Sequence, residues 1–195
     1  DRTTAQLVDV EKDGDTYRFD FDKLRRFIRL SLDCGVRYFE MSHLFTQWGA
    51  YNTPKIMAKV NGRTKKIFGW ETSSHSPEYE AFLAQFLPAL REVLKEEKVA
   101  ENCYFHISDE PAKNHFDSYR ACSTLLRKYL PDFPIMDAMA NVEYYDEKLV
   151  DIPIPFILHS QPFFDRNPKP RFIYYCGASQ RVMGCALGMP SSRNR

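Results

Sequence analysis

Two adjacent carboxylates, Asp109 and Glu110, follow an apolar segment of the sequence and stand directly before Pro111. The proline lacks an amide hydrogen, which favours the end of a strand at this point. In parallel α/β proteins, catalytic groups gather at the carboxyl ends of strands. Hydrolysis of a glycosidic bond needs a proton donor for the leaving oxygen and a group that stabilises charge at the anomeric carbon. Two neighbouring carboxylates can divide these tasks, because like charges push their pKa values apart. An exposed Asp-Glu pair at a helix N-terminus is the alternative interpretation.

The alternation of side chains along this segment predicts which groups share a face. His106, Ser108 and Glu110 fall on one face, so Glu110 is expected to point into the site. Strict alternation would turn Asp109 away from it. Both carboxylates enter one pocket only if the strand ends there and the chain turns.

The elements that must position the pair are short strands separated by helices, a pattern typical of α/β proteins. The sequence predicts strands of this kind at residues 36–41, 103–108, 135–139, 154–159 and 172–176. It predicts long helices that begin at Asp22, Ser76 and Asn114, and a short one at residues 146–150. A complete (β/α)8 barrel has eight strands and about 250 residues. The expected fold is therefore α/β of the (β/α)8 TIM-barrel type, as an incomplete barrel, and an open α/β sheet is the alternative.

Two hairpins are expected in addition to these strands. Residues 7–21 alternate apolar and polar side chains around a turn at Gly14. Residues 55–60 and 64–69 are expected to pair across a turn at Asn61-Gly62, a dipeptide typical of two-residue hairpin loops.

Four stretches of the chain carry a resemblance to a known family: His43-Leu44-Phe45-Thr46-Gln47-Trp48-Gly49, Pro54-Lys55-Ile56-Met57-Ala58, Ile67-Phe68-Gly69-Trp70 and Phe105-His106-Ile107-Ser108-Asp109-Glu110-Pro111. They resemble glycoside hydrolase family 123 and related bacterial barrel proteins of unknown function, and the Ser-Asp-Glu-Pro segment is the most specific part. The resemblance covers most of the chain. It implies that residues 1–195 are a single partial TIM-barrel catalytic domain, with flanking β-domains outside this chain.

The resemblance also implies an activity and roles for the two carboxylates. The expected enzyme is a β-N-acetylgalactosaminidase that needs no cofactor and acts on a carbohydrate, a glycan or glycolipid that contains N-acetylgalactosamine. In its substrate-assisted retaining mechanism the acetamido oxygen of the sugar attacks the anomeric carbon. Glu110 would then be the general acid and base, and Asp109 would orient the acetamido group. A β-hexosaminidase or other glycosidase, a non-catalytic carbohydrate-binding barrel and an inert fragment remain as alternatives.

Further substrate contacts are expected from loops that follow the strands. Two tryptophans could form a stacking platform for a sugar, although most of the 26 Phe and Tyr side chains must belong to the core. Polar residues after the strands at 36–41, 135–139 and 154–159 could bind hydroxyl or acetamido groups. The candidate substrate-binding residues are His43, Trp48, Trp70, Asn141, Tyr144, His159 and Gln161.

Composition and spacing argue against several other classes of protein. Lys and Arg number 27 against 26 Asp and Glu, and this balance lacks the basic excess of a nucleic-acid binder. The apolar runs are far shorter than a membrane span, no glycine-rich phosphate loop is present, and the five histidines show no metal-binding spacing. Glu40 and Asp137 are expected as buried structural carboxylates. The sequence opens on polar residues without a signal peptide, and we expect it to be a piece of a longer protein. Its five cysteines are expected to be reduced core residues, which favours a cytoplasmic protein.

Overall fold

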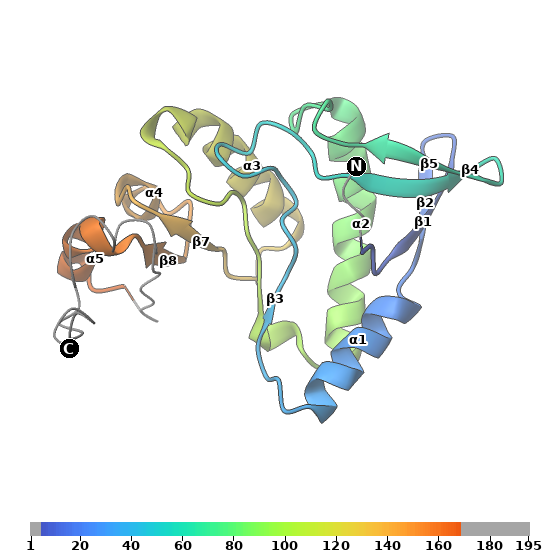
Figure 1. The fold of residues 1–195 in the computed structure, drawn as a ribbon, viewed down its shortest axis with the longest axis horizontal. Helices are drawn as coiled ribbons and strands as arrows, with labels where there is room; N and C mark the ends of the chain where they lie inside the picture. The colour runs from blue at the N-terminus through green and yellow to red at the C-terminus, as the bar shows by residue number, and fades with distance from the viewer. Residues whose placement is uncertain (1–4, 169–195) are drawn as a thin grey trace, which may run out of the picture.

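The computed structural model describes residues 5–168 of the chain (Figure 1). Its elements are β1 (Asp9–Asp13), β2 (Thr16–Asp20), α1 (Asp22–Asp33), β3 (Phe39–Glu40), β4 (Ile56–Val60), β5 (Arg63–Phe68), α2 (Pro77–Glu96), η1 (Ala100–Asn102), β6 (Cys103–Tyr104), η2 (Lys113–His115), α3 (Phe116–Tyr129), β7 (Met136–Met139), α4 (Glu143–Asp146), β8 (Ile152–Pro155), η3 (Ile157–His159) and α5 (Gln161–Arg166). None of the helices in this part of the chain is both long enough and apolar enough to cross a membrane.

Both predicted hairpins are confirmed, and they join into one four-stranded sheet with the order β2-β1-β4-β5. Each hairpin is antiparallel, and β1 pairs with β4 in parallel between them. The turns use residues that tolerate positive φ: Gly14 at +56°, Asn61 at +50° and Gly62 at +76°. We call this sheet the hairpin sheet.

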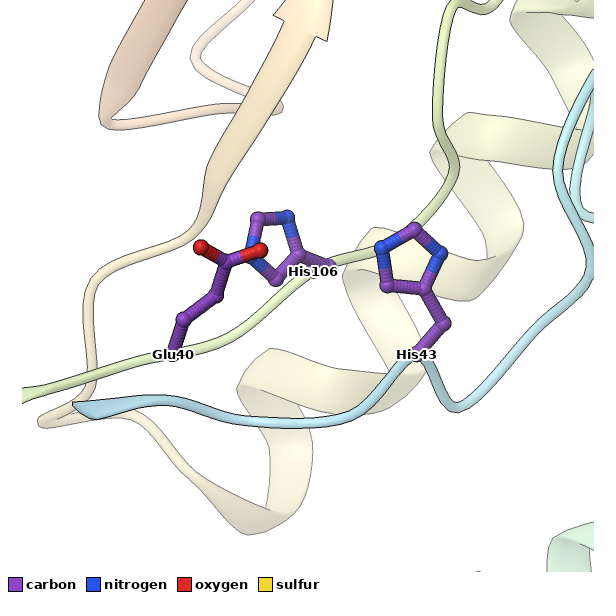
Figure 2. Close-up of side chains that lie close together, drawn as sticks. All are labelled: Glu40, His43 and His106. Carbon is purple, nitrogen blue, oxygen red and sulfur yellow. The ribbon is translucent and has the colours of Figure 1, made fainter. Parts of the chain in front are cut away.

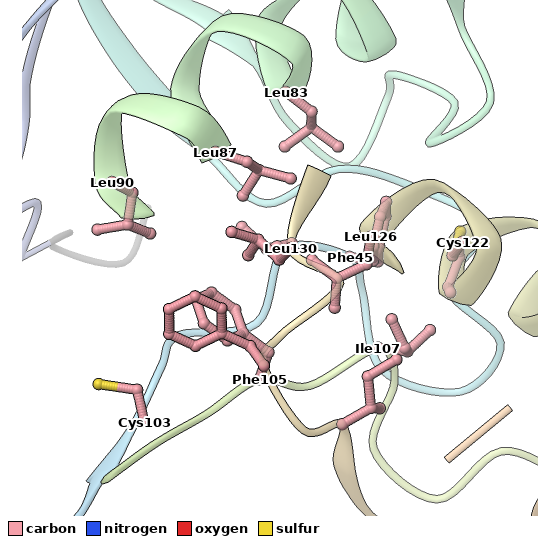
Figure 3. Packing of buried hydrophobic residues seen from close by; sticks show 14 of the residues in the cluster. Phe45, Leu83, Leu87, Leu90, Cys103, Phe105, Ile107, Cys122, Leu126 and Leu130 are labelled. Atoms are coloured by element: carbon pink, nitrogen blue, oxygen red, sulfur yellow. The ribbon is translucent and has the colours of Figure 1, made fainter. Parts of the chain in front are cut away.

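Helix α2 lies between the hairpin sheet and the part of the fold that holds α3, β7 and β8, as Figure 1 shows. It begins as predicted, with the Ser76 side chain accepting a hydrogen bond from the Tyr79 amide and Pro77 in the first turn. Phe82 packs on the sheet, with its ring centroid 5.1 Å from that of Tyr17. Figure 3 shows other α2 side chains, Leu83, Leu87 and Leu90, in the apolar cluster with Phe45, Phe105, Leu126 and Leu130. Side chains of α2 therefore join the hairpin sheet and the segments on its other side into one hydrophobic core.

The remaining strands are parallel and follow one another in chain order. β3 pairs with β6, and β7 pairs with β8. An isolated parallel bridge between Phe105 and Ile135 joins the two pairs, so the order across them is β3, β6, β7, β8. We call this set the parallel strands. Their carboxyl ends lie on one side, where the sequence places the candidate catalytic residues.

The parallel strands are shorter than predicted. The expected strand at 36–41 is paired only at Phe39–Glu40, and the one at 103–108 only at Cys103–Tyr104 with a bridge at Phe105. The amides of Ile107 and Ser108 donate instead to the Asp137 carboxylate, which ends the ladder. The strand at 135–139 is confirmed as β7.

Other predicted bounds also shift. The strand expected at 154–159 is β8, which ends at Pro155, and Ile157–His159 form a 3-10 turn; a short apolar run does not distinguish these states. Helix α3 begins at Phe116 rather than at an Asn114 cap, and the short helix lies at Glu143–Asp146. The strand predicted at 172–176 lies outside the described residues.

The cysteines are only partly as expected. Cys103 and Cys122 are free and buried, which agrees with the prediction of reduced core residues. Burial raises the pKa of each thiol to about 12, so neither is a nucleophile at neutral pH. Cys34 is free but exposed after α1, which contradicts the prediction for that residue.

Candidate active site

The loop after β3 is fastened to the segment that carries the two carboxylates. The Ser108 hydroxyl donates to the Thr46 carbonyl over 3.1 Å and accepts from the Gly49 amide over 3.0 Å. The Trp48 amide donates to the Asp109 carbonyl over 3.0 Å. Ser108 is fully buried, so these bonds are shielded from water and hold the two segments together.

The chain turns at Glu110. Its φ is +48°, a left-handed conformation that costs a residue other than glycine on the order of 1 kcal/mol. Its amide donates to the Ala138 carbonyl over 3.1 Å, which anchors the turn to β7. The alternation of side chains therefore stops before the carboxylates, as it must if both are to enter one site. Asp109 is half-buried, and Glu110 is exposed.

Glu110 lines a pocket of about 390 Å³ with Asn141 and His159, which follow β7 and β8. The rest of its lining is Pro111, Ala112, Lys113, Ala140 and Phe156. The structure thus brings together a predicted catalytic carboxyl group and two of the predicted substrate-binding residues. A separate cavity of about 330 Å³ has a mainly apolar lining and includes His43 but neither carboxylate.

Asp137 is the buried centre of a hydrogen-bond network below this site. Its Oδ2 accepts from the amides of Ile107 and Ser108 over 2.8 and 3.3 Å and from the Tyr119 hydroxyl over 2.6 Å. Its Oδ1 lies 2.9 Å from Nδ1 of His106. The prediction that Asp137 is a buried structural carboxylate is confirmed, since the side chain is only 1% exposed.

Glu40, His43 and His106 form a cluster next to this network. Figure 2 shows the three side chains together, Glu40 and His43 from the segment of β3 and His106 from the segment after β6. Glu40 Oε1 lies 2.9 Å from His106 Nε2, and the two imidazole rings stack with centroids 4.9 Å apart. The prediction that Glu40 is buried is wrong, because its side chain is 62% exposed.

The surroundings of His106 act on its pKa in opposite directions. Burial lowers the pKa, but the hydrogen bond and charge of Asp137, aided by the charges of Glu40 and Asp109, raise it above the ordinary 6.5. The contact between His106 Nε2 and Glu40 Oε1 is close enough for an ion pair but is not aligned as a hydrogen bond. Nε2 of His106 therefore has no hydrogen-bond partner within residues 5–168.

Sequence spacing could not reveal this cluster, because its members come from segments more than sixty residues apart. The parallel register of β3 and β6, which sets Glu40 opposite Tyr104, brings them together. A signal was present, since His43 follows the predicted strand at 36–41 and His106 lies near the end of the one at 103–108, but no metal-binding spacing joined them.

The other candidate residues lie in different surroundings. Trp48 is 56% exposed beside Asp109, whereas Trp70 is 62% exposed after β5 in the hairpin sheet. Tyr144 is fully buried, and its hydroxyl donates to the Ala112 carbonyl over 2.8 Å, so it supports the loop after Glu110 from below. Gln161 is exposed at the start of α5 and donates to Asp165 over 2.9 Å.

The comparison with protein families gives a match over the whole chain. The family model described as "Glycoside hydrolase 123, catalytic domain" matches residues 1–195. The chain belongs to glycoside hydrolase family 123. The predicted resemblance of the chain to that family is therefore confirmed.

A solved structure of a family 123 glycoside hydrolase from Clostridium perfringens shares the fold, with a TM-score of 0.60 and 17% sequence identity. That clostridial enzyme is described in connection with glycolipid glycan hydrolysis. The alignment covers 78% of this chain and 27% of the clostridial one, so the chain spans about a quarter of that protein's length. No curated protein matches the chain.

Proposed function

We propose that this chain carries the acid/base carboxylate of a glycoside hydrolase, and that the enzyme releases terminal β-linked N-acetylgalactosamine. The observation that carries the proposal is the position of Asp109-Glu110 in a family 123 chain. The pair lies a few residues after β6 and its bridge at Phe105, at a turn that puts Glu110 into a pocket. A carbohydrate substrate also agrees with the glycolipid glycan hydrolysis described for the clostridial enzyme.

The parallel strands β3, β6, β7 and β8 would be consecutive strands of a (β/α)8 barrel. Their sequential order and the helix α3 between β6 and β7 support this arrangement. In such a barrel the carboxyl ends of the strands surround the substrate. Asp109, Glu110, Asn141 and His159 would all face it from these ends.

In the proposed reaction, Glu110 protonates the glycosidic oxygen as the bond to the anomeric carbon breaks. The acetamido carbonyl oxygen of the sugar attacks that carbon from the opposite face and gives a cyclic oxazolinium ion. Asp109 accepts a hydrogen bond from the acetamido N–H and stabilises the positive charge that develops there. Glu110, now a carboxylate, then removes a proton from water as the water opens the ring, and the configuration is retained.

Neighbouring carboxylates suit this chemistry. The acetamido group and the leaving oxygen are attached to adjacent carbons of the sugar, so the groups that contact them must also be neighbours. In an extended strand, consecutive side chains point to opposite faces. The left-handed turn at Glu110 breaks this alternation, so the side chains of Asp109 and Glu110 need not point in opposite directions.

The test is hydrolysis of an aryl β-N-acetylgalactosaminide by the full-length protein and its Glu110→Gln and Asp109→Asn variants. Loss of general acid catalysis should lower kcat by on the order of 10²–10⁴, and by less with a good leaving group. A thiazoline that mimics the oxazolinium ion should inhibit the wild type. Glu101→Gln is the matched control, because Glu101 is exposed in η1, which precedes β6 at its opposite end.

Different results would point to the alternatives. Turnover of the glucosaminide alone would identify a β-hexosaminidase of different sugar preference. Sugar binding without turnover by the folded protein would indicate a carbohydrate-binding barrel. Full activity in both carboxylate variants would refute the assigned roles.

A further inference from the structure

The cluster of Glu40, His43 and His106 has the donor atoms of a metal site. One nitrogen from each imidazole and one carboxylate oxygen lie within 4.8 Å of one another. A tetrahedral Zn²⁺ ion with ligands at about 2.0–2.2 Å holds them about 3.3–3.6 Å apart. The separation of Glu40 and His106 is already 2.9 Å, and the exposed Glu40 side chain has room to adjust. Small side-chain movements are therefore enough to reach this geometry.

His106 is held in the orientation that a ligand needs. Asp137 contacts its Nδ1 at 2.9 Å, and Asp137 is itself fixed by the Tyr119 hydroxyl and two backbone amides. A carboxylate on one imidazole nitrogen keeps the proton there and leaves the lone pair of the other nitrogen for a metal. This pattern of carboxylate, histidine and metal is common in zinc sites.

A second observation also points to a ligand at this place. The His106 side chain is only 6% exposed, and its buried Nε2 makes no hydrogen bond in the described part of the chain, although Glu40 Oε1 lies 2.9 Å away. Buried polar nitrogen atoms in proteins are seldom left without one. This nitrogen faces the space shared with Glu40 and His43 (Figure 2).

From these observations we infer that Glu40, His43 and His106 bind a divalent transition-metal ion, with Zn²⁺ as the best match. Two imidazoles and one carboxylate form a set that zinc takes with a fourth position open to water or another oxygen ligand. Imidazole donors favour zinc, copper or nickel over magnesium or calcium. The inference is independent of the proposed glycosidase activity and assigns the metal no step in it.

The alternative occupant of the Nε2 lone pair is a proton. A protonated His106 would form an ion pair with Glu40 and Asp137, and this state competes directly with a metal. Metal binding and protonation are therefore mutually exclusive at this nitrogen, and a binding measurement distinguishes them.

The experiment is calorimetric titration of the chelator-treated, full-length protein with ZnCl₂, followed by titration with CoCl₂ and visible absorption spectroscopy. We expect the wild type to bind one equivalent of Zn²⁺ through Glu40, His43 and His106. Bound Co²⁺ should give the absorption spectrum of a tetrahedral site, and added Zn²⁺ should abolish that spectrum. His43→Ala and Glu40→Gln should each weaken that binding at least tenfold. Asp137→Asn should weaken it 10–100-fold by releasing the orientation of His106.

His75→Ala is the control, because His75 contacts Ser118 and belongs to a different part of the molecule. It should leave zinc binding unchanged. Circular dichroism of each variant establishes that it is folded, and Glu40→Gln is the safest test since Glu40 is exposed. Absence of stoichiometric binding by the folded wild type would overturn the inference, as would equal affinity in the wild type, Glu40→Gln and His43→Ala.

Discussion

The hairpin sheet and the parallel strands are held together in different ways. The hairpin sheet has strands of five or six residues, its two hairpins are paired along most of their length, and its contact with α2 is mainly aromatic. The parallel strands have two to four residues, and side chains take over where the ladders end. Asp137 and Ser108 bind backbone groups there that strands would otherwise pair.

Because of this difference, the two regions should respond differently to substitution. A mainly apolar contact between sheet and helix tolerates changes of shape, because it contains few polar groups, such as the Tyr17 amide that donates to Gln85. A buried carboxylate that accepts several hydrogen bonds leaves all of its donors unsatisfied when it is lost. The candidate site is therefore built on the less tolerant of the two arrangements, and three substitutions test the comparison.

The largest effect is expected from Asp137→Asn. The amide cannot accept from all four donors, and its own N–H₂ group would face them, so the free energy of unfolding should fall by about 3–5 kcal/mol. Urea unfolding measures this. Asp9→Asn is the control, since its exposed ion pair with Lys23 should be worth less than about 1 kcal/mol. A loss of under about 1 kcal/mol in Asp137→Asn would show that the network is not what holds the parallel strands.

A smaller effect is expected from Phe82→Leu in the interface between α2 and the hairpin sheet. The leucine keeps the surface apolar but removes ring contacts with Tyr17 at 5.1 Å and Phe68 at 5.3 Å. The free energy of unfolding should fall by about 1–2 kcal/mol. Thermal and urea unfolding provide the measurement. A loss as large as that of Asp137→Asn would break the proposed contrast between the two regions.

The smallest effect is expected from Glu97→Gln between α1 and α2. Hydrogen bonds from Arg29 at 2.8 Å and from Arg25 at 2.9 Å lower the pKa of Glu97 below its ordinary 4.5, against the opposing effect of burial. The carboxylate therefore stabilises the fold above the unfolded-state pKa, and this contribution is lost as the pH falls through the folded-state pKa.

At neutral pH the Glu97→Gln variant should be less stable by no more than about 1 kcal/mol, because Arg29 is largely exposed and water screens the pair. The difference from the wild type should shrink below pH 4.5 in urea titrations at several pH values. Glu92→Gln, which removes an exposed i,i+3 pair with Lys95, is the matched exposed control. A difference that grows on acidification would contradict the sign of this argument.

The sequence predicted the hairpin sheet well because local rules govern it. Alternation and turn residues such as Asn61-Gly62 act within a few positions, and Ser76 and Pro77 mark the start of α2 in the same way. The family was also recognisable, since the Ser-Asp-Glu-Pro segment is contiguous. These features require no knowledge of which distant residues meet.

The site was only partly predictable because contacts between distant segments decide it. The early end of β6 depends on the side chain of Asp137, about thirty residues later. Tyr144 was predicted to bind substrate because it follows a predicted strand, yet it packs against Tyr119 and Phe116 and is buried. Glu40 was expected in the core because the predicted strand was too long. Instead, the Glu40 side chain is exposed and contacts His106.

The bonds between the loop after β3 and Ser108 also bear on the order in which the molecule folds. They join residues 59 and 62 positions apart, whereas the hairpins close over a few residues. Closing a long loop costs more chain entropy, and distant contacts form late. Amides of the hairpins should gain protection from hydrogen exchange early in refolding, and the Gly49 amide should gain it among the last. A newly made chain would thus form its framework before its candidate site is assembled.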